Sequence, residues 1–401
     1  MLSSETRYCQ QCGACKAVCP AGAISFTPCQ NGLNRILVDN TKCIRCRKCI
    51  RVCPSNREAV FDQSYFDALK EKKYFLAANS DTDIARKCSS GGACKTMIID
   101  ALTQGLVDGV YSLKKTDHYP FAEGELYTKD NLPDFDSLPN SIYHSVMSCE
   151  NLNRINRVNR LMIVGTACQL HALSVALKGK VQSLVKICIF CKQQKTFDST
   201  RYFARILHED ISVHSPFLVS YRGNGWPGFV TLNHRSIPYA KASVLPFGRR
   251  LWTVPGCDIC GDPFGQNEDA DLTLMDPWGI GTAHESGQTL VVVGSAVGLQ
   301  LLNDISGLEK SEIDYPTAKV SLGLKDIWRK QVLIPYYKGK SCSELIRKAG
   351  MAETRQRLFL TSLIEHLPSM PFLFYRLLNK FIPRRRNAIL QDSEFPSRPS
   401  L

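Results

Sequence analysis

The sequence predicts a small α+β module at the amino terminus, an α/β domain after it and a helical extension at the end. Two observations lead to this division. Eight of the 18 cysteines form two equal runs within residues 9–53, and from 63 to 330 short apolar runs alternate with amphipathic stretches. Alternating strands and helices are typical of an α/β domain. We therefore expect boundaries at 1–62, 63–330 and 331–401, with a disordered tail after Gln391.

Each cysteine run has the spacing C-x2-C-x2-C-x3-C-P, which is the pattern of bacterial ferredoxins with two [4Fe–4S] clusters. Three thiolates spaced two residues apart can wrap one face of a cubane, while the fourth reaches the other cluster. We therefore expect one cluster on Cys9, Cys12, Cys15 and Cys53, and the other on Cys43, Cys46, Cys49 and Cys19. Zinc is the alternative, but it commonly uses two separated C-x-x-C pairs and does not require this pattern.

Composition narrows the function further. A chain of 401 residues can bury a core without disulfides. Its first twelve residues hold no apolar stretch, so we expect it to remain in a reducing cytoplasm where thiols stay free for metal. The net charge of +13 suits a solvated basic surface, an acidic partner or a membrane surface. No recognised nucleic-acid motif accompanies the charge, and no run of 18 apolar residues is long enough to span a membrane.

The α/β prediction rests on the middle of the chain. Apolar runs at 161–165, 185–190, 272–275 and 290–293 read as strands, and helical periodicity follows at 169–177 and 197–207. Ser90, Gly91 and Gly92 precede a helical pattern at 93–102, where glycines would let backbone N–H groups approach a phosphate. A plain helix N-cap is the alternative.

Two further segments follow strands, at the place where open α/β sheets bind ligands. They are Gly165-Thr166-Ala167, which opens a helix, and the segment from Asp276 through Trp278 to Gly279. Trp278 could cover a flavin ring or lie in the core. His171, on the helix after Cys168, is a candidate proton donor or a partly buried helix histidine.

Over about residues 80–300 the sequence resembles the family of coenzyme F420 hydrogenase/dehydrogenase beta subunits. The motifs that carry this resemblance are S-S-G-G at 89–92, V-G-T-A-C-Q at 164–169, F-C at 190–191, Y-R-G-N-G-W at 221–226, C-D-I-C at 257–260, D-A-D at 269–271 and D-P-W-G at 276–279. Each is short, but their order and spacing together are specific.

The resemblance implies an α/β flavoprotein domain with FAD beside a third [4Fe–4S] cluster. The implied flavin-binding residues are Ser90, Gly91, Gly92, Gly165, Thr166, Ala167, Gln169, Asp276, Trp278 and Gly279. The implied cluster ligands are Cys168, Cys191, Cys257 and Cys260. From spacing alone Cys188 would replace Cys168, because two C-x-x-C pairs suit zinc; the place of Cys168 in the flavin motif favours the first set.

These observations predict an iron–sulfur flavoprotein oxidoreductase that passes electrons between clusters, flavin and a small organic substrate or F420-like donor. A redox partner protein or ferredoxin is expected, and a role in polysaccharide synthesis fits bacterial relatives. The alternative is a non-catalytic electron-transfer chain that feeds a partner enzyme. The apolar spacing at 372–382, followed by the basic run 384–386, predicts either a packed helix or an interfacial one at the inner face of a membrane.

Overall fold

The computed structural model describes residues 8–391 except 58, 60, 156–157, 215, 282–284 and 368–369. Pro368 and the predicted disordered tail beyond Gln391 therefore lie outside the described residues. In the described part, no helix has the length and apolar character that crossing a bilayer requires.

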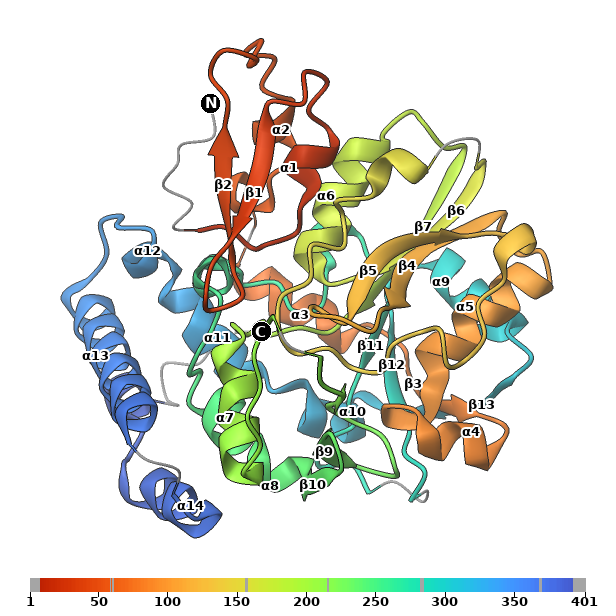
Figure 1. Cartoon of the computed structure of the whole chain (residues 1–401). Helices are drawn as coiled ribbons and strands as arrows, with labels where there is room; N and C mark the ends of the chain where they lie inside the picture. Colours follow the sequence, from red (N-terminus) through yellow and green to blue (C-terminus); the bar gives the residue numbers. More distant parts are fainter. Residues whose placement is uncertain are drawn as a thin grey trace.

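The amino-terminal module is a two-stranded ribbon with short helices, drawn in red in Figure 1. Strands β1 (Ile24–Pro28) and β2 (Asn34–Val38) pair antiparallel, and Ile24 and Ile36 fill a small core beside the cysteines. Helices α1 (Ala14–Ala17) and α2 (Lys48–Arg51) each begin within a cysteine run. Both strands lie in the segment between the two cysteine runs.

The centre of the molecule is an eight-stranded mixed sheet with the order β13-β3-β12-β11-β7-β6-β4-β5. The four strands β4, β6, β7 and β11 run parallel, and antiparallel strands extend the sheet on both sides. Its strands are β3 (Tyr74–Asn79), β4 (Gly109–Lys115), β5 (Ala122–Tyr127), β6 (Arg160–Gly165), β7 (Ser183–Ile189), β11 (Leu272–Met275), β12 (Thr289–Val293) and β13 (Leu308–Ile313). The four strands predicted from apolar runs are all in this sheet.

Along each central strand, successive side chains point to opposite faces of the sheet, so each strand contributes to two cores. Met162 and Ile187 pack under α5 (Ala93–Thr103) and α9 (Ala296–Asp304). Leu161, Ile163 and Cys188 point to the other face, which α6 (Ala167–Leu177) covers. Three more helices cover that second face beside α6: α3 (Gln63–Lys70), α10 (Tyr315–Leu322) and α11 (Leu324–Val332). Helix α4 (Thr82–Lys87) leads into α5.

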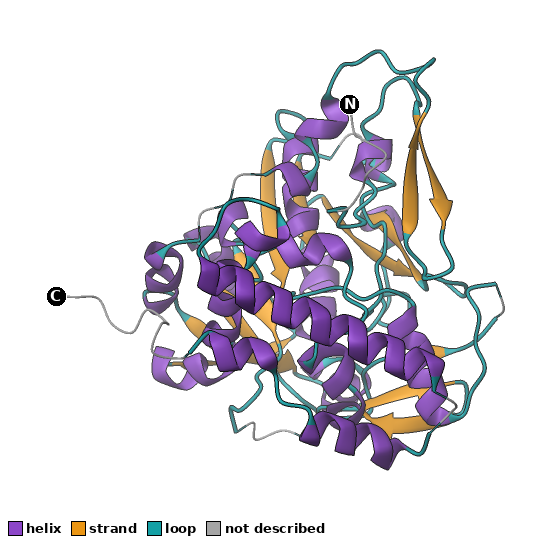
Figure 2. Cartoon of the chain, turned by 90° about the vertical axis from the view of Figure 1, so that its left-hand side faces the viewer, coloured by secondary structure: helices purple, strands orange, loops and turns teal. Residues whose placement is uncertain are grey.

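A second body packs around aromatic side chains from residues 197–252 and 360–375. It contains α7 (Asp198–Leu207), α8 (Tyr239–Ala242) and the small sheet of β8 (Val219–Ser220), β9 (Phe229–Leu232) and β10 (Arg235–Pro238). The extension adds α12 (Ile334–Tyr337), the long α13 (Glu344–His366), α14 (Phe372–Phe381) and α15 (Arg385–Ile389). Helix α13 crosses the side of the molecule that Figure 2 shows.

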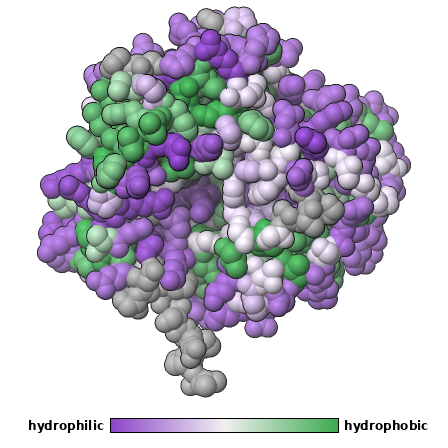
Figure 3. Space-filling model, turned by 90° about the horizontal axis from the view of Figure 1, so that it is seen from below, coloured by the Kyte–Doolittle hydropathy of each residue, from purple (hydrophilic) through white to green (hydrophobic). Residues whose placement is uncertain are grey.

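Helix α14 packs on the protein, which is the first of the two alternatives predicted for the segment 372–382. Tyr375 is buried in the aromatic core. The opposite side of the helix exposes Leu373, Leu377 and Phe381. Figure 3 shows a face of the molecule on which hydrophobic side chains gather beside a central hollow. The helix therefore packs on the protein, and its membrane contact stays a prediction.

Candidate redox site

The first thiol group consists of Cys9, Cys12, Cys15 and Cys53. Burial, with smaller contributions from the charges of Cys12 and Cys53, raises the pKa of the Cys9 thiol to about 12. Burial first, and then the charges of its three partners, raises the pKa of Cys15 as well. Four thiols this close repel one another as thiolates, and a positively charged iron centre would remove that repulsion and displace their protons. The group fits the first predicted cluster.

The second thiol group lines a small cavity at the far end of the module. Cys19, Cys43, Cys46 and Cys49 all face this cavity. The backbone N–H of Ala23 donates to Cys19 Sγ at 3.3 Å, a bond of the kind that stabilises a cluster thiolate. The chain thus brings Cys19 to the second run and Cys53 to the first, as the sequence predicted.

The third thiol group consists of Cys168, Cys191, Cys257 and Cys260 and lies at the carboxyl edge of the central sheet. Burial, and then the charges of Cys257 and Cys260, raises the pKa of the Cys191 thiol to about 12. Burial first, and then the charges of the other three thiols, raises the pKa of Cys168. Polar donors surround these sulfurs: Gln194 N–H donates to Cys257 Sγ at 3.3 Å, and Arg57 Nη2 donates to Cys260 Sγ at 3.7 Å.

Cys188 occupies a different environment from Cys168. It lies on β7 with no exposed surface and packs into the apolar core under α6. Its Sγ donates to the backbone oxygens of Ile189 and Pro263. Burial first, and then the charges of Asp262, Cys191, Cys168 and Cys260, raises the pKa of its thiol, so Cys188 lies near the third group without belonging to its polar side. The geometry therefore favours Cys168 as the fourth member of the third group.

A zinc site and a cubane cluster differ in how close together their sulfur ligands lie. Four thiolates around one zinc ion lie about 2.3 Å from a common point. Among the described residues, no three His, Cys, Asp or Glu side chains converge closely enough to hold a single ion.

The first and third thiol groups meet across a tight backbone contact. A Cβ added to Gly256 would lie 2.4 Å from the Tyr8 carbonyl oxygen and 2.5 Å from that of Cys9, so only glycine fits here. Gln10 Nε2 donates to the Gly256 oxygen at 3.2 Å. Arg57, four residues after Cys53, reaches Cys260 and also pairs with Glu268 at 2.6 Å. The amino-terminal module is therefore fixed directly against the loop of the third group.

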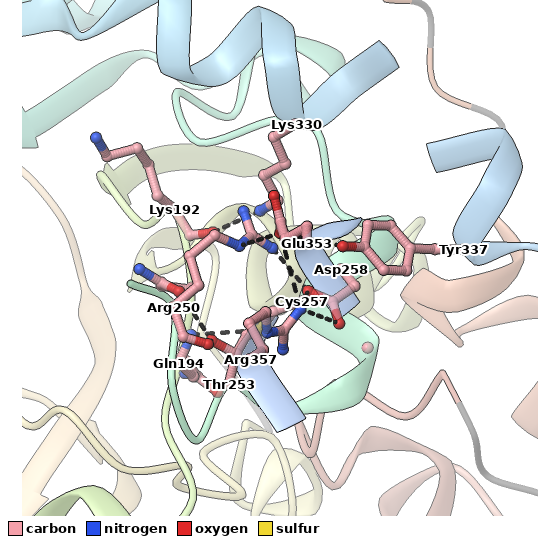
Figure 4. Close-up of polar contacts among 12 residues, drawn as sticks. Lys192, Gln194, Arg250, Thr253, Cys257, Asp258, Lys330, Tyr337, Glu353 and Arg357 are labelled. Atoms are coloured by element: carbon pink, nitrogen blue, oxygen red, sulfur yellow. Dashed lines mark hydrogen bonds and ion pairs between the residues drawn. The ribbon is translucent and has the colours of Figure 1, made fainter. Parts of the chain in front are cut away.

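A buried charge network supports that loop from the other side (Figure 4). Arg250 Nη2 donates to Asp258 Oδ1 at 2.6 Å, and its Nε lies 3.2 Å from Glu353 Oε1. Arg357 Nη1 donates to both carboxylate oxygens of Asp258 at 3.0 Å. Because Glu353 and Arg357 come from α13, the carboxyl-terminal extension holds Asp258 and the cysteines on either side of it.

A cavity of about 1500 Å³ lies beside the third group, at the carboxyl ends of β6, β7 and β11. Seven of the ten predicted flavin-binding residues line it: Ser90, Gly92, Gly165, Thr166, Gln169, Asp276 and Trp278. Gly91, Ala167 and Gly279 are not among the lining residues. Cys191 lines the cavity as well, so one wall of the cavity is a member of the third thiol group.

The two helix starts at the cavity differ in how their N–H groups are satisfied. Helix α5 begins after Gly92, which has a φ of 77°, and no side chain caps it. Ser90 Oγ donates instead to Asp276 Oδ1, so a side-chain N-cap does not explain this motif. Helix α6 carries a capping box in which Gln169 Oε1 accepts from Thr166 N–H at 2.9 Å. The N-terminus of α5 is therefore the better place for an anion.

Arg222 is buried behind the cavity wall, and the sequence did not single it out. Its guanidinium donates to Asp276 Oδ2 at 2.7 Å and lies 4.6 Å from the Tyr239 ring centroid and 4.9 Å from that of Trp226. Trp278 is 41% exposed, so its core alternative is wrong, and its indole N–H donates to Asp276 at 3.1 Å. A buried cation beneath aromatic rings and a carboxylate thus form one polar assembly. The only signal for Arg222 was its place in the Y-R-G-N-G-W motif.

His171 does not lie at the cavity. Its Nδ1 is 3.1 Å from Glu268 Oε2, on the side of α6 that faces the amino-terminal module. Glu268 in turn pairs with Arg57. This position corrects its assignment as a proton donor beside the flavin, because periodicity placed it on the helix but did not tell which neighbour its face would meet.

Family models match most of the amino-terminal module and most of the central α/β domain. The N-terminal and C-terminal models of the coenzyme F420 hydrogenase/dehydrogenase beta subunit match residues 74–131 and 158–319, and a 4Fe–4S dicluster domain matches residues 8–57. The chain belongs to the family of F420 hydrogenase/dehydrogenase beta subunits. Its amino-terminal module is an iron–sulfur dicluster domain, and its central domain is a mixed α/β fold.

Two relatives match this beta-subunit homologue over much of its length. An uncharacterized protein of Methanocaldococcus jannaschii is 21% identical over 67% of this chain and 80% of its own length. One of the subunits of the F(420)H(2) dehydrogenase of Methanosarcina mazei is 24% identical over 45% of this chain and 51% of its own length, so this match spans about half of that protein.

A further relative matches the dicluster domain alone, and one solved structure superposes on most of the chain. A ferredoxin-like protein from the nif region of Rhizobium leguminosarum bv. trifolii is 44% identical over 12% of this chain and 73% of its own length. A chain of the F420-reducing [NiFe] hydrogenase complex from Methanosarcina barkeri superposes with a TM-score of 0.48 at 16% identity, covering 73% of this chain and 96% of that one.

Proposed function

We propose that this chain is an iron–sulfur flavoprotein oxidoreductase with three [4Fe–4S] clusters in series and FAD in the large cavity. The single observation that carries this proposal is the double position of Cys191, which belongs to the third thiol group and lines the cavity. A cofactor in the cavity would lie against the ligand of a one-electron centre. When bound, flavin would exchange two electrons with an organic molecule and single electrons with the clusters.

The size and the lining of the cavity support a flavin dinucleotide as its ligand. Its volume of about 1500 Å³ exceeds the range of about 300–1,000 Å³ common for small-ligand pockets. The uncapped N-terminus of α5 would receive phosphate through backbone N–H groups. Trp278 offers an indole face at the wall, and Arg222 holds Asp276 in place from behind.

The remaining volume would admit the molecule that exchanges electrons with the flavin. The name of the Methanosarcina mazei relative supports reduced F420 or a similar donor, and a small organic substrate is the other class. A link to polysaccharide synthesis stays a prediction. The same relative is one subunit of a larger enzyme, which favours a second function: a chain that passes electrons to a partner enzyme without binding a substrate of its own.

Anaerobic purification and cofactor analysis test the proposal. We expect about twelve irons and twelve sulfides per chain, since each [4Fe–4S] cluster holds four of each, together with one FAD. Cys257→Ser should lose about four irons and sulfides and keep FAD. Cys29→Ser is the matched control, since its Sγ contacts only the Thr27 carbonyl oxygen. A full set of clusters without any flavin would refute the flavoprotein and favour the non-catalytic electron-transfer chain.

A further inference from the structure

Five exposed basic side chains surround the second thiol group. They lie within a ten-residue segment that also carries three of the four thiols, and they are Lys42, Arg45, Arg47, Lys48 and Arg51. We name this set the basic collar. At its centre Ile44, directly after Cys43, is 65% exposed, a rare position for an isoleucine. The collar thus combines five exposed cations with one exposed apolar side chain.

The positive charge of the collar is almost uncompensated. Lys42 lies 3.4 Å from Asp39 Oδ2, and both side chains are exposed, so this pair neutralises little. Across the described residues, no ion pair is formed by the other four cations of the collar. Elsewhere in the chain arginines such as Arg57, Arg160 and Arg250 are paired with carboxylates. A dense cationic surface without partners raises the local potential that an approaching protein meets.

The collar also lies at the outer end of the series of centres. The first thiol group contacts the loop of the third group through Gly256, and the third group borders the cavity. Cys12 and Cys15 of the first group are buried, whereas all four thiols of the second group are partly exposed. An external electron carrier can therefore come closest to the second group.

We propose that the basic collar and Ile44 form the docking surface for a small acidic protein that carries one electron at a time. The proposal rests on the proposed function, because it needs a [4Fe–4S] cluster on Cys19, Cys43, Cys46 and Cys49. In the forward direction the docked carrier is oxidised by one electron and this cluster is reduced by one, with no bond made or broken. Charge attraction sets the encounter rate and orientation, and the small apolar centre allows close approach.

The test compares two triple charge reversals that change the net charge equally. The collar variant is K42E/K48E/R51E, which leaves the cysteines and the left-handed residues Arg45 and Arg47 unchanged. The control is K241E/R376E/K380E on α8 and α14, whose side chains are exposed and which lie at the opposite end of the molecule in Figure 1. Iron, sulfide and flavin contents are measured first for each variant.

Two measurements with a purified acidic ferredoxin follow. Calorimetry gives the Kd for the oxidised carrier, and stopped-flow absorbance gives the second-order rate constant with the reduced carrier. At low salt, the collar variant should have a Kd about tenfold higher or more and a second-order rate constant about tenfold lower or more than the unchanged protein. Both differences should vanish near 1 M salt, where the Debye length is about 3 Å. The control variant should match the unchanged protein. Dithionite, a small reductant that needs no docking surface, should reduce all three proteins alike.

Several outcomes would overturn the docking surface. Equal losses of ferredoxin affinity and rate constant in the collar and control variants would show that only the net charge matters and would refute a specific surface. Unchanged rates in a collar variant that dithionite still reduces would refute the surface and leave the proposed function intact, whereas absent clusters in the unchanged protein would remove the proposed function itself. Finally, the collar variant could lose binding to phosphatidylserine vesicles while its Kd for the ferredoxin stays unchanged. That result would refute the protein docking surface and assign the collar to a membrane.

Discussion

Lys330 is expected to raise the reduction potential of the proposed third cluster. It lies on α11, beyond the residues that the family model matches, and only 4% of it is exposed. Its ammonium donates to the carbonyl oxygen of Lys192, the residue after Cys191. Burial lowers the pKa of Lys330, whereas the charges of Cys260 and then Cys257 and Cys191 raise it. A bound cluster with thiolate ligands would strengthen the effect of the cysteine charges, which raises the pKa, and would keep the ammonium charged.

Lys330→Met removes this charge and keeps most of the side-chain length. For an assumed separation of about 8 Å between two unit charges and an effective dielectric constant of about 20, the Coulomb energy is about 2 kcal/mol. Reduction adds one negative charge to the cluster, so loss of the cation destabilises the reduced form by about that amount. Because about 1.4 kcal/mol corresponds to about 59 mV for one electron, the potential should fall by about 90 mV.

An anaerobic redox titration followed by electron paramagnetic resonance measures this shift. The signal of the third cluster is the one that Cys257→Ser removes. Lys348→Met is the matched control, because Lys348 lies on α13 with 66% of its side chain exposed. A shift below about 20 mV would mean that Lys330 is neutral or that the charge is screened as at a surface. Equal shifts of all three signals would show a general change and refute the local reasoning.

The same geometry makes three more predictions. Cys168→Ala should lose about four irons per chain and Cys188→Ala should keep them; equal iron contents would return Cys188 to the ligand set. Arg222→Met should lower the free energy of unfolding by about 3 kcal/mol, since it leaves Asp276 without its buried partner, and should reduce bound flavin; denaturant titration and flavin absorbance measure the two, with Arg222→Lys as the charge-conserving control. Burial lowers the pKa of His144 from 6.5 to about 4, so between these values the unfolded chain binds more protons than the folded protein and stability falls as the pH falls; urea titrations should show a loss of about 1 kcal/mol from about pH 6.5 to about pH 5.5 that His144→Asn does not show.

The sequence predicted most about the amino-terminal module because its ligands are local. The exchange of Cys19 and Cys53 between the two runs follows from the run spacing, and the cavity lined by Cys19, Cys43, Cys46 and Cys49 agrees with it. Strands of the central sheet were also predictable, since they are buried on both faces and read as continuous apolar runs. The edge strand β5 and the short strands β8 to β10 have no such pattern.

The parts of the site that escaped prediction depend on contacts between distant segments. Arg222 meets Asp276 and Ser90 only after three separate loops converge. His171 was placed on the correct helix, but its neighbour Glu268 lies 97 positions later in the chain. Neither a residue type nor a helical period encodes such a meeting. In both cases the sequence identified the element and could not identify which surface of the fold it would face.

The carboxyl-terminal extension contributes directly to the candidate redox site. Family models end at residue 319, yet Lys330, Glu353 and Arg357 all act on the loop of Cys257 and Cys260. Without α13, Asp258 would lose one of its two arginines and Arg250 would lose one of its two carboxylates, and both groups are buried. Breaking one side of a buried pair costs about 3–5 kcal/mol, so the loop that carries two of the four thiols would lose its fixed position. Since the same loop contacts the amino-terminal module through Gly256, α13 also stabilises the junction between the first and third thiol groups.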